Sequence, residues 1–413
     1  MDAILNGYRV LDLCTGGCLV CGKILADLGA DVIKIEPPGG DPTRNIGPFF
    51  GGIPHRERSL YWFAFNTNKR GMTLKIESPE GKGIFRKLVE TADVVLENFD
   101  VGYLDKLGLG YDDLKAINPK VIMTSVTPFG QTGPYKDYKG ADMVVWALGG
   151  LMNLCGDPDR QPVQVSLPQA YIAAGTYAAE GTMVALFERE NSGLGQQIDV
   201  SAQATITWFI SELIPFYNLL GQDMKRAGGA ITRAGGLLCP IVYKCQDGYI
   251  SYMITAGLPG AERNEKMVLW LEEEGLATDY LRQKDWVNWD WVGMTKEELE
   301  KISKPVSELF IRYKAQDLYD EAIRWGVSLF PVSTSQDIMG NAQLEARGFW
   351  TPLYHEALDT TLTYPGAFAL IPETPLSVSK RAPLIGEHNQ EVYVEELGLT
   401  LEEMVSLQGI GVV

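Results

Sequence analysis

The stretch Tyr8-Arg9-Val10-Leu11-Asp12-Leu13 begins the part of the chain that decides the fold. A loop of small residues over 14–22 follows it, then a short helix over about 23–28, and then the apolar run Asp31-Val32-Ile33-Lys34-Ile35-Glu36. Gly29-Ala30 ends the helix, as glycine commonly does at helix C-termini. Two short apolar runs joined by a helix are typical of buried parallel strands, so this segment predicts a βαβ unit.

The same alternation of strand and helix continues to about residue 200. Further strands are predicted at 72–76, 94–97, 121–125 and 197–200, and helices at about 79–91, 111–117 and 171–191. Ser78 is a typical N-cap and Pro79 a typical first residue of a helix. The pattern predicts an α/β fold with a mostly parallel, doubly wound sheet.

The character of the chain changes after about residue 224. Residues 242–254 are expected to form a β-hairpin, and residues 262–325 are acidic, helical and rich in tryptophan. We therefore expect residues 1–224 to form the first part of a large domain and residues 225–330 a smaller α+β domain. Residues 331–413 are expected to return to the large domain.

Composition narrows the classes of partner. The net charge of −17 repels phosphate backbones, so nucleic acid is not expected to bind. The chain lacks an apolar run long enough to span a membrane and an N-terminal signal pattern, so a cytoplasmic location without membrane contact is expected. A few local lysines and arginines still allow a phosphorylated small ligand.

Cysteine and histidine give no strong metal signal. The six cysteines are too few and too unevenly spaced for a disulfide framework. Cys14, Cys18 and Cys21 have the spacing of an iron–sulfur ligand set, but no aromatic residue stands beside the last of them. Three small buried thiols are the simpler interpretation. The three histidines lie far apart in the sequence, so neither a metal nor a resident cofactor is expected.

Three loops at predicted strand ends carry residues suited to ligand binding. They span 66–70, 97–108 and 127–135. Ligands of open parallel sheets bind at the carboxyl ends of the strands. The loop 97–108 combines an amide, two aromatic rings and a lysine, which together suit a purine and a phosphate. Taken one at a time, each loop is equally compatible with an ordinary solvated connection.

Taken together, these motifs resemble the class III CoA-transferases, a family that includes formyl-CoA transferase and carnitine CoA-transferase. The resemblance covers about residues 6–205 and 330–413. It rests on Asn66-Thr67-Asn68-Lys69-Arg70, Ser78-Pro79-Glu80-Gly81, Glu97-Asn98-Phe99 with Leu104-Asp105-Lys106-Leu107-Gly108, Asn118-Pro119-Lys120-Val121-Ile122, Phe129-Gly130-Gln131-Thr132-Gly133-Pro134, Gly193-Leu194-Gly195-Gln196 and Arg381-Ala382-Pro383-Leu384-Ile385-Gly386-Glu387-His388.

The resemblance implies a Rossmann-like large domain built from both chain ends, and two subunits interlocked like links of a chain. It also implies a site for coenzyme A, as the substrate thioester rather than as a cofactor. The implied contacts are Leu74, Lys75, Asn98, Phe99, Tyr103, Lys106, Leu107 and Lys139. Lys106 would meet a phosphate, and Phe99 or Tyr103 would stack on adenine. Lys139 and Asp142 would face the thioester, and Tyr61 would lie near the active site.

One position departs from the family pattern. In these transferases an aspartate attacks the donor thioester, giving a mixed anhydride and then an aspartyl-CoA thioester. Counting back from Phe187-Glu188-Arg189-Glu190 and anchoring on Gly175, that position holds Tyr171. No Asp or Glu occurs between Gln161 and Ala179, so a shifted alignment offers only Asp157, Asp159 or Glu180. A phenol with a pKa near 10 is a poor nucleophile at neutral pH.

Two smaller departures point the same way. The loop at Gly16-Gly17 lacks the glutamine of formyl-CoA transferase, and Lys139-Gly140-Ala141-Asp142 lacks the histidine that related racemases use. Racemization needs two acid–base groups across the α-carbon, so that activity is not expected.

The sequence therefore predicts the subunit without a nucleophile in a heteromeric CoA-transferase. Its partner would be a homologous, Asp-bearing subunit in an interlocked heterodimer or heterotetramer. Benzylsuccinate CoA-transferase of anaerobic aromatic degradation is the two-subunit type expected, with CoA moving from a donor such as succinyl-CoA to an acid such as benzylsuccinate. Two alternatives stay open: a self-sufficient homodimeric transferase, and a non-catalytic protein that binds CoA thioesters.

Overall fold

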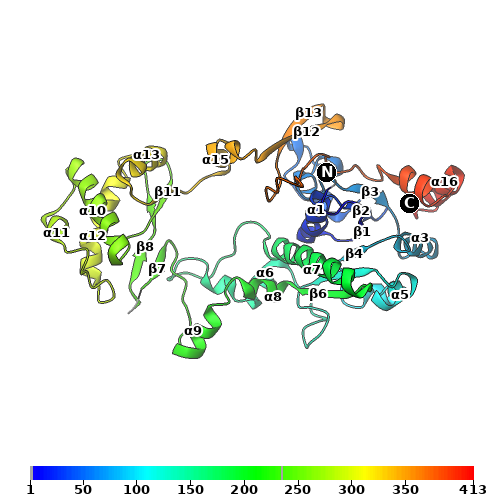
Figure 1. Ribbon diagram of the computed structural model, residues 1–413, viewed down its shortest axis with the longest axis horizontal. Helices are drawn as coiled ribbons and strands as arrows, with labels where there is room; N and C mark the ends of the chain where they lie inside the picture. Colours follow the sequence, from blue (N-terminus) through cyan, green and yellow to red (C-terminus); the bar gives the residue numbers. More distant parts are fainter. Residues whose placement is uncertain (1–2, 234–235) are drawn as a thin grey trace. The chain divides into compact units, whose positions relative to one another are not determined.

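The computed structural model describes residues 3–233 and 236–413. Residues 1–2 and 234–235, which belong to the predicted ranges 1–224 and 225–330, lie outside the described part. The chain divides into two compact units (Figure 1). The first contains the chain up to Leu151, Val165–Ile214 and Gln343–Val413, and the second contains Met152–Gln164 and Pro215–Ala342.

These borders differ from the expected ones at 224/225 and 330/331, and long-range hydrogen bonds tie residues 152–164 to the second unit. The backbone N–H of Gly228 donates to Gly156 O at 3.0 Å. The Arg226 guanidinium donates to the carbonyl oxygens of Asp157 and Arg160 at 3.1 and 2.7 Å. Residues 152–164 therefore belong to the second unit although they lie within the first stretch of the sequence.

The core of the first unit is a six-stranded parallel sheet in the order β3-β2-β1-β4-β5-β6. Its strands are β1 Arg9–Asp12, β2 Asp31–Glu36, β3 Arg70–Thr73, β4 Val94–Glu97, β5 Ile122–Thr127 and β6 Gln197–Ser201. The strand order reverses between β1 and β4, which makes that point the topological switch of the sheet. The predicted α/β fold with a doubly wound sheet is confirmed.

Capping residues set the ends of several helices that cover this sheet. The helix α3 (Pro79–Val89) begins after Ser78, whose hydroxyl accepts from the Gly81 N–H at 2.9 Å. The long helix α7 (Ala170–Ser192) ends at Gly193, which has a left-handed φ of 73°. The other helices of this unit used below are α1 Leu19–Asp27, α2 Leu60–Phe65, α4 Tyr103–Leu107, α5 Tyr111–Ile117, α6 Asp142–Leu148, α8 Ala202–Trp208 and α16 Leu401–Gly409.

The C-terminal segment completes the first unit beside β3. The Asn389 side chain accepts from the Thr73 N–H at 2.9 Å and donates to the Thr73 hydroxyl at 2.8 Å. The Tyr393 hydroxyl donates to the Thr73 carbonyl oxygen at 2.5 Å. Further on, the Val412 carbonyl accepts from the Lys75 N–H at 2.8 Å. A hairpin of β12 (Trp350–His355) and β13 (Thr360–Pro365) packs near α2 through the core that holds Trp62 and Tyr364.

The second unit has its own core. A three-stranded sheet of β9 (Val242–Lys244), β10 (Tyr249–Tyr252) and β11 (Leu329–Pro331) packs with the helices α10 Gly257–Glu273, α12 Lys296–Phe310 and α13 Ala315–Trp325. Trp270 and Trp286 are buried in it. The Lys284 ammonium lies 4.8 Å from the Trp289 ring centroid and pairs with Glu298 at 2.5 Å. The tryptophans therefore serve mainly as core and as partners of a buried cation.

No helix in the described residues is long and apolar enough to cross a membrane.

Candidate active site

The loops after β1 and β4 are tied together at the switch point of the sheet. The Asn98 side chain accepts from the Thr15 N–H at 2.9 Å and donates to the Thr15 carbonyl at 3.0 Å. Because both ends of the amide are used, Asn98 fixes the loop after β4 relative to the loop after β1. The predicted contact residue is thus present at the switch point, where it holds the two loops together.

An aromatic pair follows directly on the turn after β4. The ring centroids of Phe99 and Tyr103 lie 4.7 Å apart, and both rings are half-buried against the core of the first unit. The Tyr103 hydroxyl donates to a Glu77 carboxylate oxygen at 2.6 Å. Burial and the negative Glu77 raise the pKa of Tyr103 to about 12, so the phenol stays protonated. The hydrogen bond joins the turn to the segment after β3.

The remaining predicted contact residues fall into two groups. Leu74 is buried and Leu107 half-buried, and both pack in the same core. Lys75 and Lys106 are exposed, and neither forms an ion pair with a residue in the described part of the chain. Lys139 is exposed and pairs with Asp100, which brings the segment before α6 next to the turn. The predicted residues therefore follow the carboxyl ends of the strands β3, β4 and β5.

Tyr171 lies in the first turn of α7 and holds the segment before α6. Its hydroxyl donates to the Gly140 carbonyl oxygen at 2.8 Å, and its backbone N–H donates to an Asp142 carboxylate oxygen at 3.2 Å. Burial raises the pKa of the phenol further above its ordinary value of 10. The phenol is therefore protonated and engaged as a hydrogen-bond donor.

The glycine loop after β1 packs directly on this turn of α7. A Cβ atom at Gly17 would lie 2.8 Å from the Tyr171 Cβ, a distance that real Cβ atoms do not reach. Glycine at this position therefore allows the loop to meet the helix backbone. Sequence reasoning noted Gly17 only for the glutamine missing there.

The Tyr61 phenol and the Cys18 thiol near Tyr171 hold their protons at neutral pH. Burial raises the pKa of Tyr61 to about 12, with further contributions from Cys18 and Asp142. Burial also raises the pKa of the Cys18 thiol to about 12. A thiol or phenol that holds its proton is a weak nucleophile. Asp142 is the carboxylate that the structure places against Tyr171.

The other carboxylates considered from sequence are placed differently. Asp157 and Asp159 belong to the second unit and are exposed. Glu180 is exposed on α7, nine residues after Tyr171, which is roughly 13 Å along the helix. Within the first unit, Glu180 therefore does not substitute for a carboxylate at Tyr171.

Sequence reasoning missed the importance of Glu97, the last residue of β4. Its side chain is only 5% exposed and accepts from the Phe99 N–H at 2.8 Å. Burial raises its pKa to about 7. The available signal was a glutamate directly after the apolar run Val94-Val95-Leu96. A residue at the carboxyl end of an interior strand tends to be buried.

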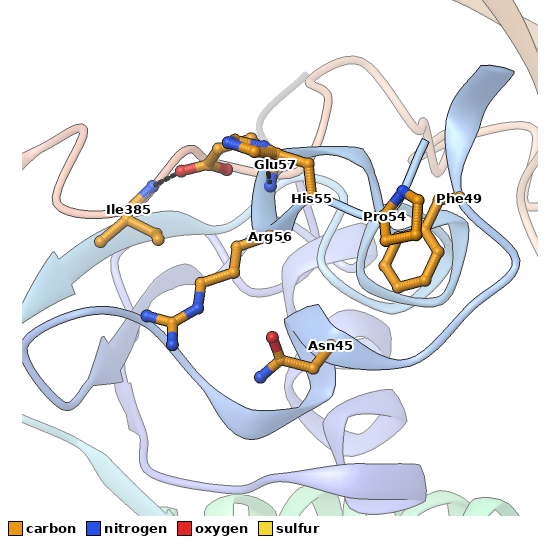
Figure 2. A pocket seen from close by; sticks show the side chains of 7 residues that line it. All are labelled: Asn45, Phe49, Pro54, His55, Arg56, Glu57 and Ile385. Atoms are coloured by element: carbon orange, nitrogen blue, oxygen red, sulfur yellow. Dashed lines mark hydrogen bonds between the residues drawn. The ribbon is translucent and has the colours of Figure 1, made fainter. Parts of the chain in front are cut away.

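A cavity of about 720 Å³ lies beside the loop after β2 (Figure 2) and was not predicted. Its lining consists of Asn45, Phe49, Pro54, His55, Arg56, Glu57 and Ile385. Glu57 accepts from the Ile385 N–H at 2.9 Å and pairs with Arg44 at 2.6 Å. The His55 Nδ1 accepts from the Glu57 N–H at 3.1 Å. Glu57 thus ties the loop after β2 to the C-terminal segment at this cavity.

Comparison with known proteins establishes the class. The chain matches CoA-transferase family III over residues 5–389. It therefore belongs to this family, and the predicted family and enzyme class are confirmed. The interlocked dimer and the residue contacts to CoA remain predictions.

Individual relatives of known name and structure are similar to this chain over nearly its full length. The chain is 35% identical to the succinyl-CoA:(R)-benzylsuccinate CoA-transferase subunit BbsE of Thauera aromatica, over 96% of this chain and 95% of that protein. It is 31% identical to the succinyl-CoA–D-citramalate CoA-transferase of Chloroflexus aurantiacus, over 98% and 96%. Its fold matches the crystal structure of a CAIB/BAIF family protein from Brucella suis with a TM-score of 0.79 and 30% identity, covering 96% of this chain and all of that one.

Proposed function

We propose that this chain is the subunit without a nucleophile in a cytoplasmic, two-subunit CoA-transferase that uses succinyl-CoA as donor. A homologous subunit, interlocked with it in a heterodimer or heterotetramer, supplies the attacking aspartate. The acceptor is a carboxylic acid of the benzylsuccinate type. Transfer then occurs in the partner's pocket, while this chain is needed to form the complex.

The arrangement of Tyr171 carries the proposal. Its phenol occupies the position that the family resemblance assigns to the nucleophile, and it donates a hydrogen bond to Gly140 at 2.8 Å. A protonated phenol in that arrangement cannot form the mixed anhydride with which the family reaction begins. Tyr61 and Cys18, which also lie there, hold their protons at neutral pH.

The relatives support the donor and the subunit arrangement. The Thauera aromatica relative is named as one subunit of a benzylsuccinate CoA-transferase, and both curated relatives are named for succinyl-CoA. The identity of 35% over nearly the full length makes a shared donor the simplest expectation.

Exposed apolar side chains on the first unit support a protein partner. Val184 and Phe187 on α7 are 64% and 75% exposed, and Met143 and Leu148 on the neighbouring α6 are 60% and 50% exposed. Large apolar side chains exposed at the surface are typical of permanent subunit interfaces. We call these four residues, two on each helix, the α6–α7 patch.

The test is activity with and without the partner. The chain would be purified alone and also co-expressed with the homologous chain that has Asp at the position of Tyr171. Each preparation would receive succinyl-CoA and benzylsuccinate, and the products would be separated by liquid chromatography. We expect turnover at the background rate for the chain alone and clear turnover for the pair. Full turnover by the chain alone would contradict the proposal.

A self-sufficient homodimer is the second candidate, and Asp142 favours it. Its carboxylate lies at the N-terminus of α7, within 3.2 Å of the Tyr171 N–H. There it could attack the thioester carbonyl carbon with loss of CoA thiolate, leaving an anhydride on Asp142. An active chain whose Asp142→Asn variant is inactive would identify this enzyme. A chain that binds CoA thioesters, recruits no homologous subunit and gives no turnover would instead be the non-catalytic binding protein.

A further inference from the structure

Glu97 is an ionizable residue at the carboxyl end of the interior strand β4, where the turn 98–107 begins. It is 5% exposed, and its carboxyl oxygen accepts from the Phe99 N–H at 2.8 Å. The Phe99 ring in turn packs against the Tyr103 ring, with the centroids 4.7 Å apart and the planes tilted by 33°. One backbone hydrogen bond therefore connects the Glu97 carboxyl group to the aromatic pair.

The surroundings of Glu97 do not compensate a negative charge. A small hollow of about 20 Å³ beside it is lined by no lysine, arginine or histidine of the described residues. The titratable groups that face it are Asp100, Tyr103, Asp105, Tyr111, Asp199 from β6 and the protonated Cys18 thiol. Among these, Asp100 is paired with Lys139. The neutral Ser125 on β5 and the Phe99 N–H are the groups that favour the carboxylate.

As a result, the carboxyl group is balanced between its two states. Burial, with smaller contributions from the Asp105 and Asp199 carboxylates, raises its pKa to about 7 against the lowering effect of Ser125 and the Phe99 N–H. Any additional negative charge placed near it will favour the protonated form.

We infer that Glu97 takes up a proton when a polyanionic CoA thioester docks on the turn 98–107, so that affinity for the ligand falls as the pH rises through neutrality. This inference rests on the proposed function for the identity of the ligand. It adds a proton-linked positioning residue at the edge of the CoA site.

The physical reason is mutual repulsion in a water-poor setting. The pyrophosphate and 3′-phosphate of CoA carry several negative charges, and ionized Glu97 would repel them from a position with little screening. The protonated carboxyl group is neutral, and its carbonyl oxygen can still accept from the Phe99 N–H. Ligand binding and protonation therefore favour each other, and this coupling is reciprocal.

Calorimetry of CoA binding measures the proton directly. CoA would be titrated into the chain at pH 7.5 in MOPS, HEPES and Tris, whose ionization enthalpies differ. A rise of one unit in the carboxyl pKa on binding predicts uptake of about half a proton and about a five-fold loss of affinity from pH 6 to pH 8. Dephospho-CoA, whose phosphates do not titrate in this range, would separate the ligand's own proton from that of Glu97.

Two variants locate the proton. Glu97→Gln should bind CoA with little proton uptake. Its affinity should depend on pH only as far as the phosphate groups of CoA themselves titrate. Glu80→Gln, which removes an exposed carboxylate of α3, should behave like the wild type. If Glu97→Gln does not fold, uptake by the wild type with dephospho-CoA decides the question.

The outcomes separate the two proposals. Binding of CoA without excess proton uptake, or equal uptake by wild type and Glu97→Gln, overturns the inference and leaves the proposed function standing. Absence of any CoA binding to this chain also overturns the inference, while the proposed function, in which the partner's pocket performs the transfer, is decided by the activity test with and without the partner. Uptake that disappears only in Glu97→Gln supports the inference, whichever subunit performs the transfer.

Discussion

At the scale of single residues, Tyr171 ties the first turn of α7 to the segment that leads into α6. Its hydroxyl and its backbone N–H hold Gly140 and Asp142 at the first turn of α7. A long helix directs positive charge toward its N-terminus, which would stabilize a carboxylate placed there. The backbone is therefore suited to a nucleophilic aspartate that the side chain does not supply.

Restoring the carboxylate should restore chemistry. We expect Tyr171→Asp to raise the transferase rate of the chain alone at least about ten-fold above background, since general mechanisms of covalent catalysis depend on the nucleophile itself. The measurement is succinyl-CoA consumption with benzylsuccinate. Tyr171→Phe is the matched control, because it removes the hydroxyl without adding a nucleophile. Equal rates in the two variants would show that another group limits the reaction.

Glu97 should make stability depend on pH. Its folded pKa of about 7 lies above its ordinary value of 4.5, so the folded state binds the proton more tightly than the unfolded state does. Its contribution is therefore fully present below about pH 4.5 and is lost as the pH rises through 7. Glu97→Gln should match the wild type near pH 5 and be more stable by about 1–3 kcal/mol at pH 8 in urea unfolding. A constant difference across this range would contradict the assignment.

At the scale of elements, the close contact of α1 and α7 positions the candidate site (Figure 1). A Cβ atom at Gly175 would lie 2.7 Å from Val20 Cγ1 and 3.2 Å from the Cys18 Cα. The absent side chain allows the two helices to approach, and this approach brings the glycine loop to Tyr171.

Substitution at this contact should destabilize the first unit. We expect Gly175→Ala to cost about 1–3 kcal/mol in urea unfolding, because an extra methyl group forces the helices apart. Gly83→Ala in α3 is the matched control, since a Cβ there meets nothing within 4 Å. The control should gain about 0.5–1 kcal/mol from helix propensity alone. A neutral or stabilizing Gly175→Ala would contradict the packing argument.

The elements also show which parts of the sequence analysis could succeed. The strands β2 and β4 and the helix α5 match their predicted ranges, because apolar runs and local capping signals define them. Helix α1 begins at Leu19, earlier than the predicted 23, since the helix is stabilized by packing under α7 rather than by a cap residue. Local pattern cannot reveal that contact.

The candidate site likewise combines features that the local sequence predicts with contacts that only the folded chain creates. Loop composition singled out residues 97–108 as a possible ligand site, and the family resemblance placed Tyr171 where a carboxylate is expected. The double hydrogen bond of Asn98 to Thr15 and the pairing of Lys139 with Asp100 join segments 83 and 39 residues apart. Burial of Glu97 likewise depends on β5 and β6. Such contacts arise only once the sheet is formed.

At the scale of the whole molecule, the account requires a partner subunit. The α6–α7 patch is the surface of the first unit that we expect to be covered in the complex. Phe187, which is 75% exposed, is the residue of the patch whose burial would contribute most to the free energy of assembly.

A polar residue at this position should weaken assembly. We expect Phe187→Ser to shift the co-expressed complex toward separate subunits by at least about ten-fold in dissociation constant, measured by light scattering after gel filtration. Val405→Ser on α16 is the matched control, because Val405 is also exposed, at 54%, but lies outside the patch. Unchanged assembly by Phe187→Ser would place the interface elsewhere.

The most direct test is to locate the covalent intermediate. The co-expressed complex would be incubated with succinyl-CoA, treated with borohydride or hydroxylamine, and digested for mass spectrometry of each subunit. The account predicts a modified aspartate on the partner and no modification of this chain, including Asp142 and Tyr171. An acyl or CoA adduct on any side chain of this subunit would contradict it.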